Sequence, residues 1–454
     1  MIPIHRNRTN CLQRLWILLC CAFAVLGISD DTNKPVPAKA GKVLQLGKLL
    51  RDAVARNPGL KAARLEWSAA LARIPQVKAW PDPVIQYAYF QENVETRVGP
   101  QEHKIGVMQS FPFPGTLTAA GKQALERARI AQVRHEKILR DLVVAVKLSY
   151  YELVYLQEGL ELLGRQQQLL QHALKLAETL YTRQEATLQD VLRARSEAAQ
   201  LDYDRMLLTE LQEVERAHLA ALVNRPVVEI QGGFSLPRLR MADYDYHRLE
   251  QLAMERREEL RIARLTVRAT EYGEALAGYA NLPKFTLGAT RILTGEAANP
   301  AMADSGKDPV IFSLGMTLPW NWERNSARRR EAEALHQAAR LKVEDLENST
   351  RAAVRRLYFQ LVNARRLVIL YEKTLLPQAA QAMEVAQQWQ TDRTRNFSGF
   401  LETQSVWLNF QMARLRAATD YLKAQAMLEQ ITGGTLSEAL LPSAKQSHSE
   451  GGEK

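Results

Sequence analysis

Residues 142–181 read LVVAVKLSYYELVYLQEGLELLGRQQQLLQHALKLAETLY, and this stretch decides the fold. Stepping through it in alternating intervals of four and three residues gives twelve positions, ten of them apolar: Leu142, Val146, Ser149, Leu153, Leu156, Leu160, Leu163, Gln167, Leu170, Leu174, Ala177 and Tyr181. A repeat of 3.5 residues sustained over this length predicts a coiled-coil seam rather than one face of a globular helix.

The same seam occurs a second time, 208 residues further on. Ten of its twelve positions are again apolar: Thr350, Val354, Leu357, Leu361, Ala364, Val368, Tyr371, Leu375, Gln378, Ala382, Val385 and Trp389. Each seam lies inside a long run, 116–183 or 326–391, that contains no proline except Pro377. At 1.5 Å per residue, each run would form a helix of roughly 100 Å. Polar clusters at 182–187 and 391–396 predict turns into return helices at 188–224 and 397–432.

The repeat extends beyond the seams to the whole chain. IGVMQSFP at 105–112 parallels FSLGMTLP at 312–319, and LKAARL at 60–65 parallels LRIARL at 260–265. The blocks keep their order while the offset drifts only between 200 and 208. We therefore predict a tandem duplication, with repeats at 43–232 and 245–436, linkers at 30–42 and 233–244, and a flexible tail at 437–454.

Each repeat also predicts a pair of strands. In the first repeat, a helix at 46–79 is followed by strands at 84–90 and 104–111. In the second repeat, a helix at 247–280 is followed by strands at 284–292 and 310–318. The last strand alternates, with Phe312, Leu314 and Met316 on one face and Ser313 and Gly315 on the other. Four strands do not close a barrel, so their edges are expected to pair with other chains.

The first 29 residues predict a secretory signal. Basic residues including Arg6, Arg8 and Arg14 precede an uncharged apolar core from Leu15 to Leu26. The alternative is a buried N-terminal helix. All three cysteines lie in this segment, so cleavage would leave a mature chain without thiols. A lipid anchor on Cys20 or Cys21 is disfavoured, because a small residue does not precede Cys20.

Composition removes several classes of function. The chain has 454 residues, 46% of them hydrophobic, and only one long apolar stretch, which excludes a polytopic helical membrane protein. Its net charge of +10 is spread along the chain, unlike the clustered basic face of a nucleic-acid-binding protein. The histidines are scattered without the spacing of metal ligands: His103, His135, His172, His218, His247 and His336. We therefore expect no enzyme, no cofactor and no resident metal.

Together these features resemble the TolC-type outer-membrane efflux proteins. Besides the duplication, the resemblance rests on NPGLKAA at 57–63, AWPDP at 79–83, FPFPG at 111–115 and DVLRA at 190–194. It implies a mainly α fold with a small membrane β-barrel contribution, in which three chains form one α/β barrel. The helices would continue through the periplasm and meet an adaptor protein and an inner-membrane pump, most simply of the resistance-nodulation-division type.

The resemblance also implies where the functional residues lie. Family members carry two acidic residues, three apart, at the second hairpin tip, where Gly399 and Glu402 stand here. Glu402, Asp190 and Asp392 are thus candidates for a pore constriction, and a ring of Glu402 carboxylates would favour cations. Candidates for adaptor contact are Arg183, Gln184, Thr187, Thr394, Asn396 and Ser398. The alternative is that these residues are ordinary solvated groups at helix ends.

Several functional interpretations remain open from the sequence. The conduit could carry small molecules, metal ions or, in type I secretion, proteins. The 57–83 region resembles heavy-metal efflux members, but the mature chain has no ladder of methionine or histidine. A periplasmic adaptor has one hairpin and many short strands, whereas this chain predicts two hairpins and four strands. A soluble coiled-coil rod would explain the heptads but neither the signal nor the strands.

Overall fold

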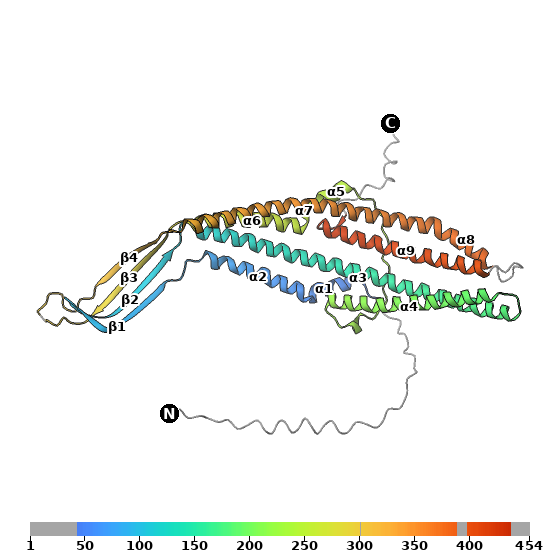
Figure 1. Cartoon of the computed structure of the whole chain (residues 1–454), viewed down its shortest axis with the longest axis horizontal. Coiled ribbons are helices and arrows are strands. Elements are labelled where there is room, and N and C mark those ends of the chain that lie inside the picture. The colour runs from blue at the N-terminus through green and yellow to red at the C-terminus, as the bar shows by residue number, and fades with distance from the viewer. Residues whose placement is uncertain (1–42, 300, 388–396, 437–454) are drawn as a thin grey trace, which may run out of the picture. The chain divides into compact units, whose positions relative to one another are not determined.

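The computed structural model describes residues 43–299, 301–387 and 397–436 of the chain. The predicted signal, the 30–42 linker and the 437–454 tail lie outside these residues, as do Cys20, Cys21, Asp392, Thr394 and Asn396. The described part is mainly helical, with one small antiparallel sheet, and this confirms the predicted fold class (Figure 1).

Both repeats follow the predicted order of elements. The first comprises α1 (Leu46–Arg56), α2 (Pro58–Lys78), β1 (Val84–Thr96), β2 (Gly99–Phe111), α3 (Thr116–Thr182), α4 (Leu188–Val223) and the short helix η1 (Val227–Ile230). The second comprises α5 (Tyr246–Arg256), α6 (Glu258–Tyr279), β3 (Lys284–Thr294), β4 (Val310–Thr317), α7 (Trp322–Leu370), η2 (Tyr371–Leu375), α8 (Leu376–Gln387) and α9 (Phe397–Ile431). Because α3 starts just after β2 and ends at the first turn, the sheet and this turn lie at opposite ends of α3.

The expectation of one continuous helix at the start of each repeat was wrong. Asn57 separates α1 from α2 with ψ at 122°, outside the helical region, because Pro58 disfavours a helical conformation in the residue before it. The Asn57 side chain then caps α2 by accepting a hydrogen bond from Leu60 N at 3.1 Å. Arg257 breaks the second repeat at the equivalent position, although no proline follows it.

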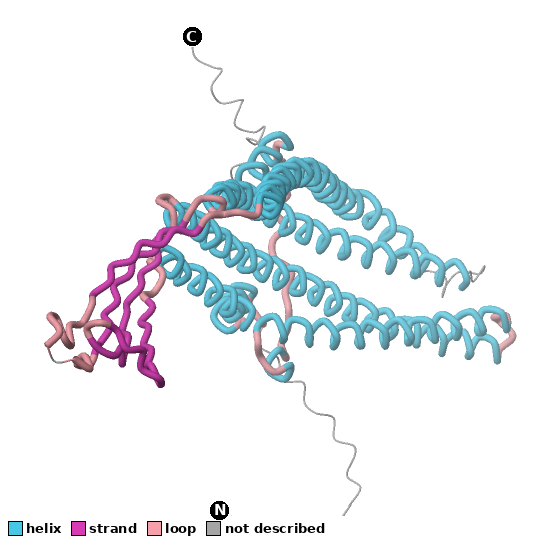
Figure 2. Tube along the Cα trace, turned by 60° about the vertical axis from the view of Figure 1, so that its left-hand side comes forward, coloured by secondary structure: helices cyan, strands magenta, loops and turns pink. Residues whose placement is uncertain are grey.

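The two strand pairs join into a single sheet with the order β1-β2-β3-β4 (Figure 2). The join is the antiparallel pairing of β2 with β3, in which Met108 faces Gly288. Among residues 43–299, 301–387 and 397–436, β1 and β4 therefore each have one neighbouring strand and an unpaired second edge. Such open edges are ready to pair with another chain.

The faces of this sheet differ sharply in polarity. Cross-strand pairing places Ile85, Val107, Ala289 and Phe312 in one row on the same face. In β4, Phe312 is 84% exposed and Leu314 is 74% exposed, far more than large apolar side chains show in a solvated domain. The opposite face carries most of the small and polar side chains, including Gln86, Gly106, Thr290 and Ser313, together with the apolar Met108 and Ile311. The predicted alternation is thus present, with its apolar face uncovered within the chain.

The predicted seam of α3 is buried along most of its length. Eight of its positions are buried: Leu142, Val146, Ser149, Leu153, Leu156, Leu163, Leu170 and Ala177. In the middle of α3, Leu153 packs in a cluster with Leu249 of α5 and Leu428 of α9. Towards the turns, Leu163 and Leu170 belong to a second cluster that joins both helical hairpins. The core is therefore a set of helix–helix seams, as the heptad repeat predicts.

The predicted seam of the second repeat is correct only as far as Val368. A π-helical turn, η2, follows it and adds one residue to the helix, so the buried positions move from Gln378 and Ala382 to Ala379 and Met383. The turn ends at Leu375, two residues before Pro377. Proline lacks an N–H and its ring crowds the carbonyl four residues earlier, and a π-turn accommodates both effects.

This shift of register gives a matched test with two alanines. We expect Ala379→Asp to destabilise the second hairpin by about 3 kcal/mol, because it buries an unpaired carboxylate in a seam. Ala382→Asp adds the same group at an exposed position and is expected to change stability little. Thermal unfolding of the purified protein would rank the two variants. The opposite ranking would show that the uninterrupted heptad is the true register.

A cluster of charges ties α3 to α9. Glu152 accepts hydrogen bonds from Arg416 Nη1 at 2.9 and 3.0 Å, and also from Lys423 Nζ. A second ion pair joins Lys147 Nζ to Glu429 at 2.5 Å. Burial by itself would raise the pKa of Glu152, but the bonds and charges of Lys423 and Arg416 outweigh it and hold this pKa below its ordinary value.

We expect Glu152→Gln to lower the free energy of unfolding by about 2 kcal/mol at neutral pH. Among the described residues, the substitution leaves Lys423 without an anion and leaves Arg416 with Asp420 alone. A carboxylate whose pKa is lowered by folding stabilises the protein above its unfolded pKa, and that contribution is lost as the pH falls through the folded pKa. The difference between wild type and variant should therefore shrink in acid. Glu161→Gln, at an exposed position of the same helix, is the control. A difference that does not change with pH would contradict this role.

Candidate functional site

The first hairpin tip is a tightly closed turn. Gln184 adopts a left-handed conformation with φ at 59°, directly after the end of α3. Its N–H donates to Tyr181 O at 2.9 Å, and the N–H of Glu185 donates to Leu180 O at 2.8 Å. These two bonds form a Schellman motif, in which glycine is the usual residue at the left-handed position. The conformation holds Arg183 and Gln184 exposed at the end of the hairpin.

The start of α4 is fixed by Thr187 and Asp190. Asp190 N donates to Thr187 Oγ1 at 3.2 Å, while the Asp190 carboxylate accepts from Thr187 N at 3.1 Å and from Thr187 Oγ1 at 2.6 Å. This reciprocal arrangement is a capping box, and a negative charge in the first turn also suits the helix dipole. Asp190, predicted as a constriction residue, thus has a local structural function at the tip.

The second tip packs against the first through apolar side chains. Phe397, Phe400 and Leu401 at the start of α9 share a buried cluster with Val191 and Ala194 of α4. Phe397 and Phe400 also face each other, with ring centroids 6.4 Å apart. The two hairpins of one chain therefore form a single packed unit at the described part of the tips.

Polar bonds reinforce this contact between hairpins. Arg193 of α4 donates to Ser398 Oγ of α9, a predicted tip residue, and pairs with Glu197 at 3.6 Å. Burial raises the pKa of Glu197, and it outweighs the opposing effects of Arg193 and of a hydrogen bond from Ser405. Within the first hairpin, Arg195 pairs with Glu178 at 2.8 Å. The tip thus carries ion-paired side chains in addition to the constriction and adaptor residues that were predicted from the sequence.

Glu402 lies on the exposed side of α9, next to the buried Leu401. Among the described residues, its carboxylate makes no hydrogen bond or ion pair, in contrast to the carboxylate of Asp190. The structure therefore brings Ser398 beside Arg193, uses Asp190 with Thr187 in a cap, and shows no partner for Glu402 among the residues it describes. The remaining residues predicted for the constriction and for adaptor contact lie in the segment that is not described: Asp392, Thr394 and Asn396.

Sequence reasoning did not identify the network of Arg193, Glu197, Arg195 and Glu178. The spacing of Arg193 and Glu197, four residues apart on a helix, was a usable signal for one pair. The bond from Arg193 to Ser398 spans 205 residues of sequence, and nothing local predicts it.

The described residues contain no group of three or more histidine, cysteine, aspartate or glutamate side chains arranged to hold a metal ion.

Over the same described residues, no helix is both long and apolar enough to cross a membrane.

Comparison with known families gives a match over most of the chain. The model of the family described as outer membrane efflux protein matches two successive segments of the chain, residues 49–225 and 249–434. No curated protein matches the chain.

Solved structures of similar fold include three outer-membrane proteins. VceC of Vibrio cholerae is 18% identical, with a TM-score of 0.72 over 86% of this chain and 97% of that one. The outer membrane channel CmeC of Campylobacter jejuni is 15% identical, with a TM-score of 0.69 over 86% and 85%. The outer membrane channel MtrE of Neisseria gonorrhoeae, in an open state, is 17% identical, with a TM-score of 0.66 over 87% and 91%. At these identities the likeness establishes the fold.

Proposed function

The chain belongs to the outer membrane efflux protein family, and we propose that it is the passive, trimeric outer-membrane conduit of a tripartite efflux system. Proteins of this family are channels rather than enzymes, which agrees with the expectation that no covalent chemistry takes place here. In the proposed system the pump supplies energy, the adaptor connects pump and conduit, and the cargo crosses the periplasm and outer membrane through the lumen.

The observation that carries this proposal is the four-stranded sheet. Its apolar face is exposed in the single chain, its opposite face carries most of the small and polar side chains, and among the described residues both of its edge strands are open. Strands that alternate apolar and polar residues suit a barrel with lipid outside and water inside. Lipid cannot hydrogen-bond a free backbone edge, so β1 and β4 require partners from other copies. Three copies would supply twelve strands.

The helices support the same assembly with a second unpartnered surface. A stripe on α4, here called the α4 stripe, consists of Tyr203, Leu207, Leu211 and Val214, which are 54%, 39%, 44% and 66% exposed. Their spacing of four, four and three residues places all four side chains on one face of the helix. An apolar stripe of this kind facing water would be unfavourable, so a neighbouring copy is its proposed occupant.

The hairpin tips are the proposed docking site for the adaptor. Arg183, Gln184 and Thr187 lie at the exposed end of the first hairpin, beyond the packed cluster of the two tips. Ser398 is bonded to Arg193, so its proposed role depends on that bond being retained or exchanged. An inner-membrane pump, most simply of the resistance-nodulation-division type, completes the proposed system.

We also propose Glu402 as the principal constriction residue. Its carboxylate is exposed and unpaired among the described residues, so three copies close to one axis would form a ring of free negative charge. Asp190 can contribute to the same field while its cap is intact, and Asp392 remains a candidate from the undescribed segment. Such a mouth would favour small cationic cargo, including metal ions, over anions.

The proposal is tested by the native mass and the conductance of the detergent-extracted protein in planar bilayers. We expect a trimer that gives discrete conductance steps. Val214→Glu, which places a charge in the α4 stripe, should yield monomers and no steps. Glu213→Gln changes the neighbouring exposed residue outside the stripe and should behave as wild type. A wild-type protein that remains a soluble monomer or never conducts would contradict the proposed function.

A further inference from the structure

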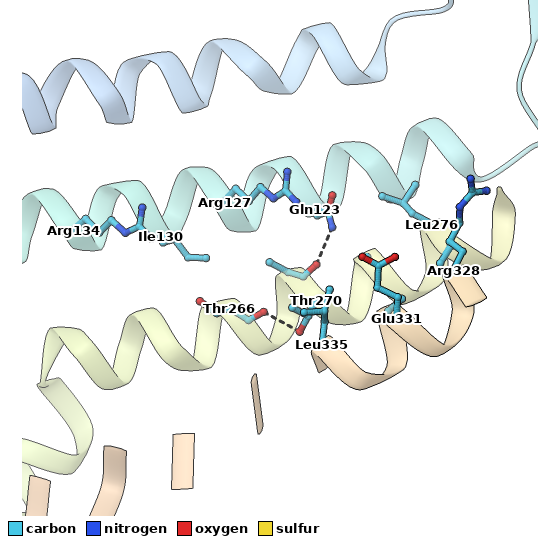
Figure 3. A pocket seen from close by; sticks show the side chains of 14 residues that line it. Gln123, Arg127, Ile130, Arg134, Thr266, Thr270, Leu276, Arg328, Glu331 and Leu335 are labelled. Carbon is cyan, nitrogen blue, oxygen red and sulfur yellow. Dashed lines mark hydrogen bonds between the residues drawn. The ribbon is translucent and has the colours of Figure 1, made fainter. Parts of the chain in front are cut away.

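A cavity of about 710 Å³ lies between α3, α6 and α7 (Figure 3). It is formed by one chain, away from the hairpin tips and at the end of these helices nearer the sheet. Volumes of this order are typical of sites for small organic ligands.

The walls of the cavity are largely apolar. Ile130 of α3, Leu276 of α6 and Leu335 of α7 line it from three helices, together with small residues such as Gly273. Gly273 allows a close approach, because a Cβ there would come within 2.9 Å of Gln123 Nε2. Gln123 Nε2 in turn donates to Ala269 O at 3.2 Å and joins α3 to α6 (Figure 3). The cavity therefore lies between packed helices and is open to solvent on one side, where Arg127, Arg134 and Leu335 are exposed.

Three arginines line this apolar space. Arg127 and Arg134 come from α3, and Arg328 comes from α7. Within the described residues, none of the three makes a hydrogen bond or an ion pair. Glu331 is the acidic residue of the lining and is likewise unpaired there, so the formal charge of the site is +2.

Several neighbouring arginines outside the cavity have acidic partners. Arg129 pairs with Glu126 at 2.6 Å, Arg261 pairs with Glu136 at 2.7 Å, and Arg264 pairs with Glu347 at 3.1 Å. These three cations have internal partners, whereas those of the cavity have none. The polar side chains of the cavity wall are also engaged, since Thr270 donates to the backbone of its own helix. The free donors of the cavity are thus its guanidinium groups.

We propose that this cavity binds an amphipathic organic anion, with one carboxylate, sulfonate or sulfate group on an apolar body. A guanidinium group presents paired N–H donors that match the oxygens of such a group. The apolar walls would cover the rest of the ligand, which an inorganic anion lacks. The site lies within one chain, so the proposal does not depend on the conduit or on a constriction at Glu402.

The test uses the full-length protein in a neutral detergent and 1-naphthalenesulfonate as the probe, with binding measured by titration calorimetry against a detergent blank. We expect saturable binding, with one site per chain. Arg127→Gln and Arg134→Gln should each weaken binding about tenfold, the effect of losing one charge-assisted contact. Ala332→Phe, which fills the cavity from α7, should abolish it.

Two controls separate this site from general attraction of anions. Arg268→Gln removes the same charge from α6 at a position that lines a different groove, and it should leave the affinity unchanged. Naphthalene-1-methanol, which keeps the apolar body without the charge, should not bind measurably. Circular dichroism and native mass establish that each variant is folded. Absence of probe binding by wild type, or an equal loss in Arg268→Gln, would overturn the proposal.

Discussion

Leu314→Arg is expected to abolish assembly of the channel in the outer membrane, whereas Ser313→Arg is expected to leave assembly intact. The two residues are neighbours in β4 and both are exposed in the single chain, so the substitutions differ chiefly in the face of the sheet that they change. Leu314 pairs with Leu287 on the apolar face, and Ser313 pairs with Gly288 on the polar face.

The expected difference follows from the solvent on each side of the sheet. An arginine on the lipid face of a membrane barrel costs about 2–4 kcal/mol near the midplane, and a trimer would carry three of them. An arginine on the lumen side remains in water and changes conductance rather than stability. The amount of heat-stable trimer in the outer-membrane fraction measures the effect. Equal yields of the two variants would show that the apolar face does not meet lipid.

Glu402→Lys is expected to reverse the charge selectivity of the channel. If three Glu402 carboxylates surround the mouth, the substitution replaces a ring of three negative charges by three positive ones. The ratio of cation to anion permeability should fall by about tenfold or more. Reversal potentials in a salt gradient across a planar bilayer give this ratio directly.

The matched control is Glu213→Lys, which makes the same change of charge at an exposed position of α4 outside the α4 stripe, away from the tip. It should keep the wild-type ratio while forming the same trimer. Wild-type selectivity in the Glu402→Lys channel would show that Glu402 does not form the constriction. It would not contradict the proposal that the protein is a channel. Asp190 and the undescribed Asp392 would then be the remaining candidates for that role.

The Glu402 assignment also shows the limit of sequence reasoning about sites. Asp190 and Glu402 are equivalent as acidic residues near a turn, and the sequence does not rank them. The structure separates them, because the Asp190 carboxylate is occupied by Thr187 and that of Glu402 has no partner among the described residues. The sequence also did not identify the arginines of the cavity as a group, because α3, α6 and α7 become neighbours only in the folded chain.

The sequence by itself determined the order of the strands and long helices and the seam of α3, because a face that is buried at regular intervals requires apolar residues at the same intervals. It also determined the alternating faces of the strands. Only the tertiary structure decided the register beyond Val368, where a π-turn before Pro377 shifts the seam by one residue. It alone placed β2 beside β3 and Arg193 beside Ser398. Local patterns record which face of an element is buried, whereas the partner that covers it depends on the packing of the whole chain.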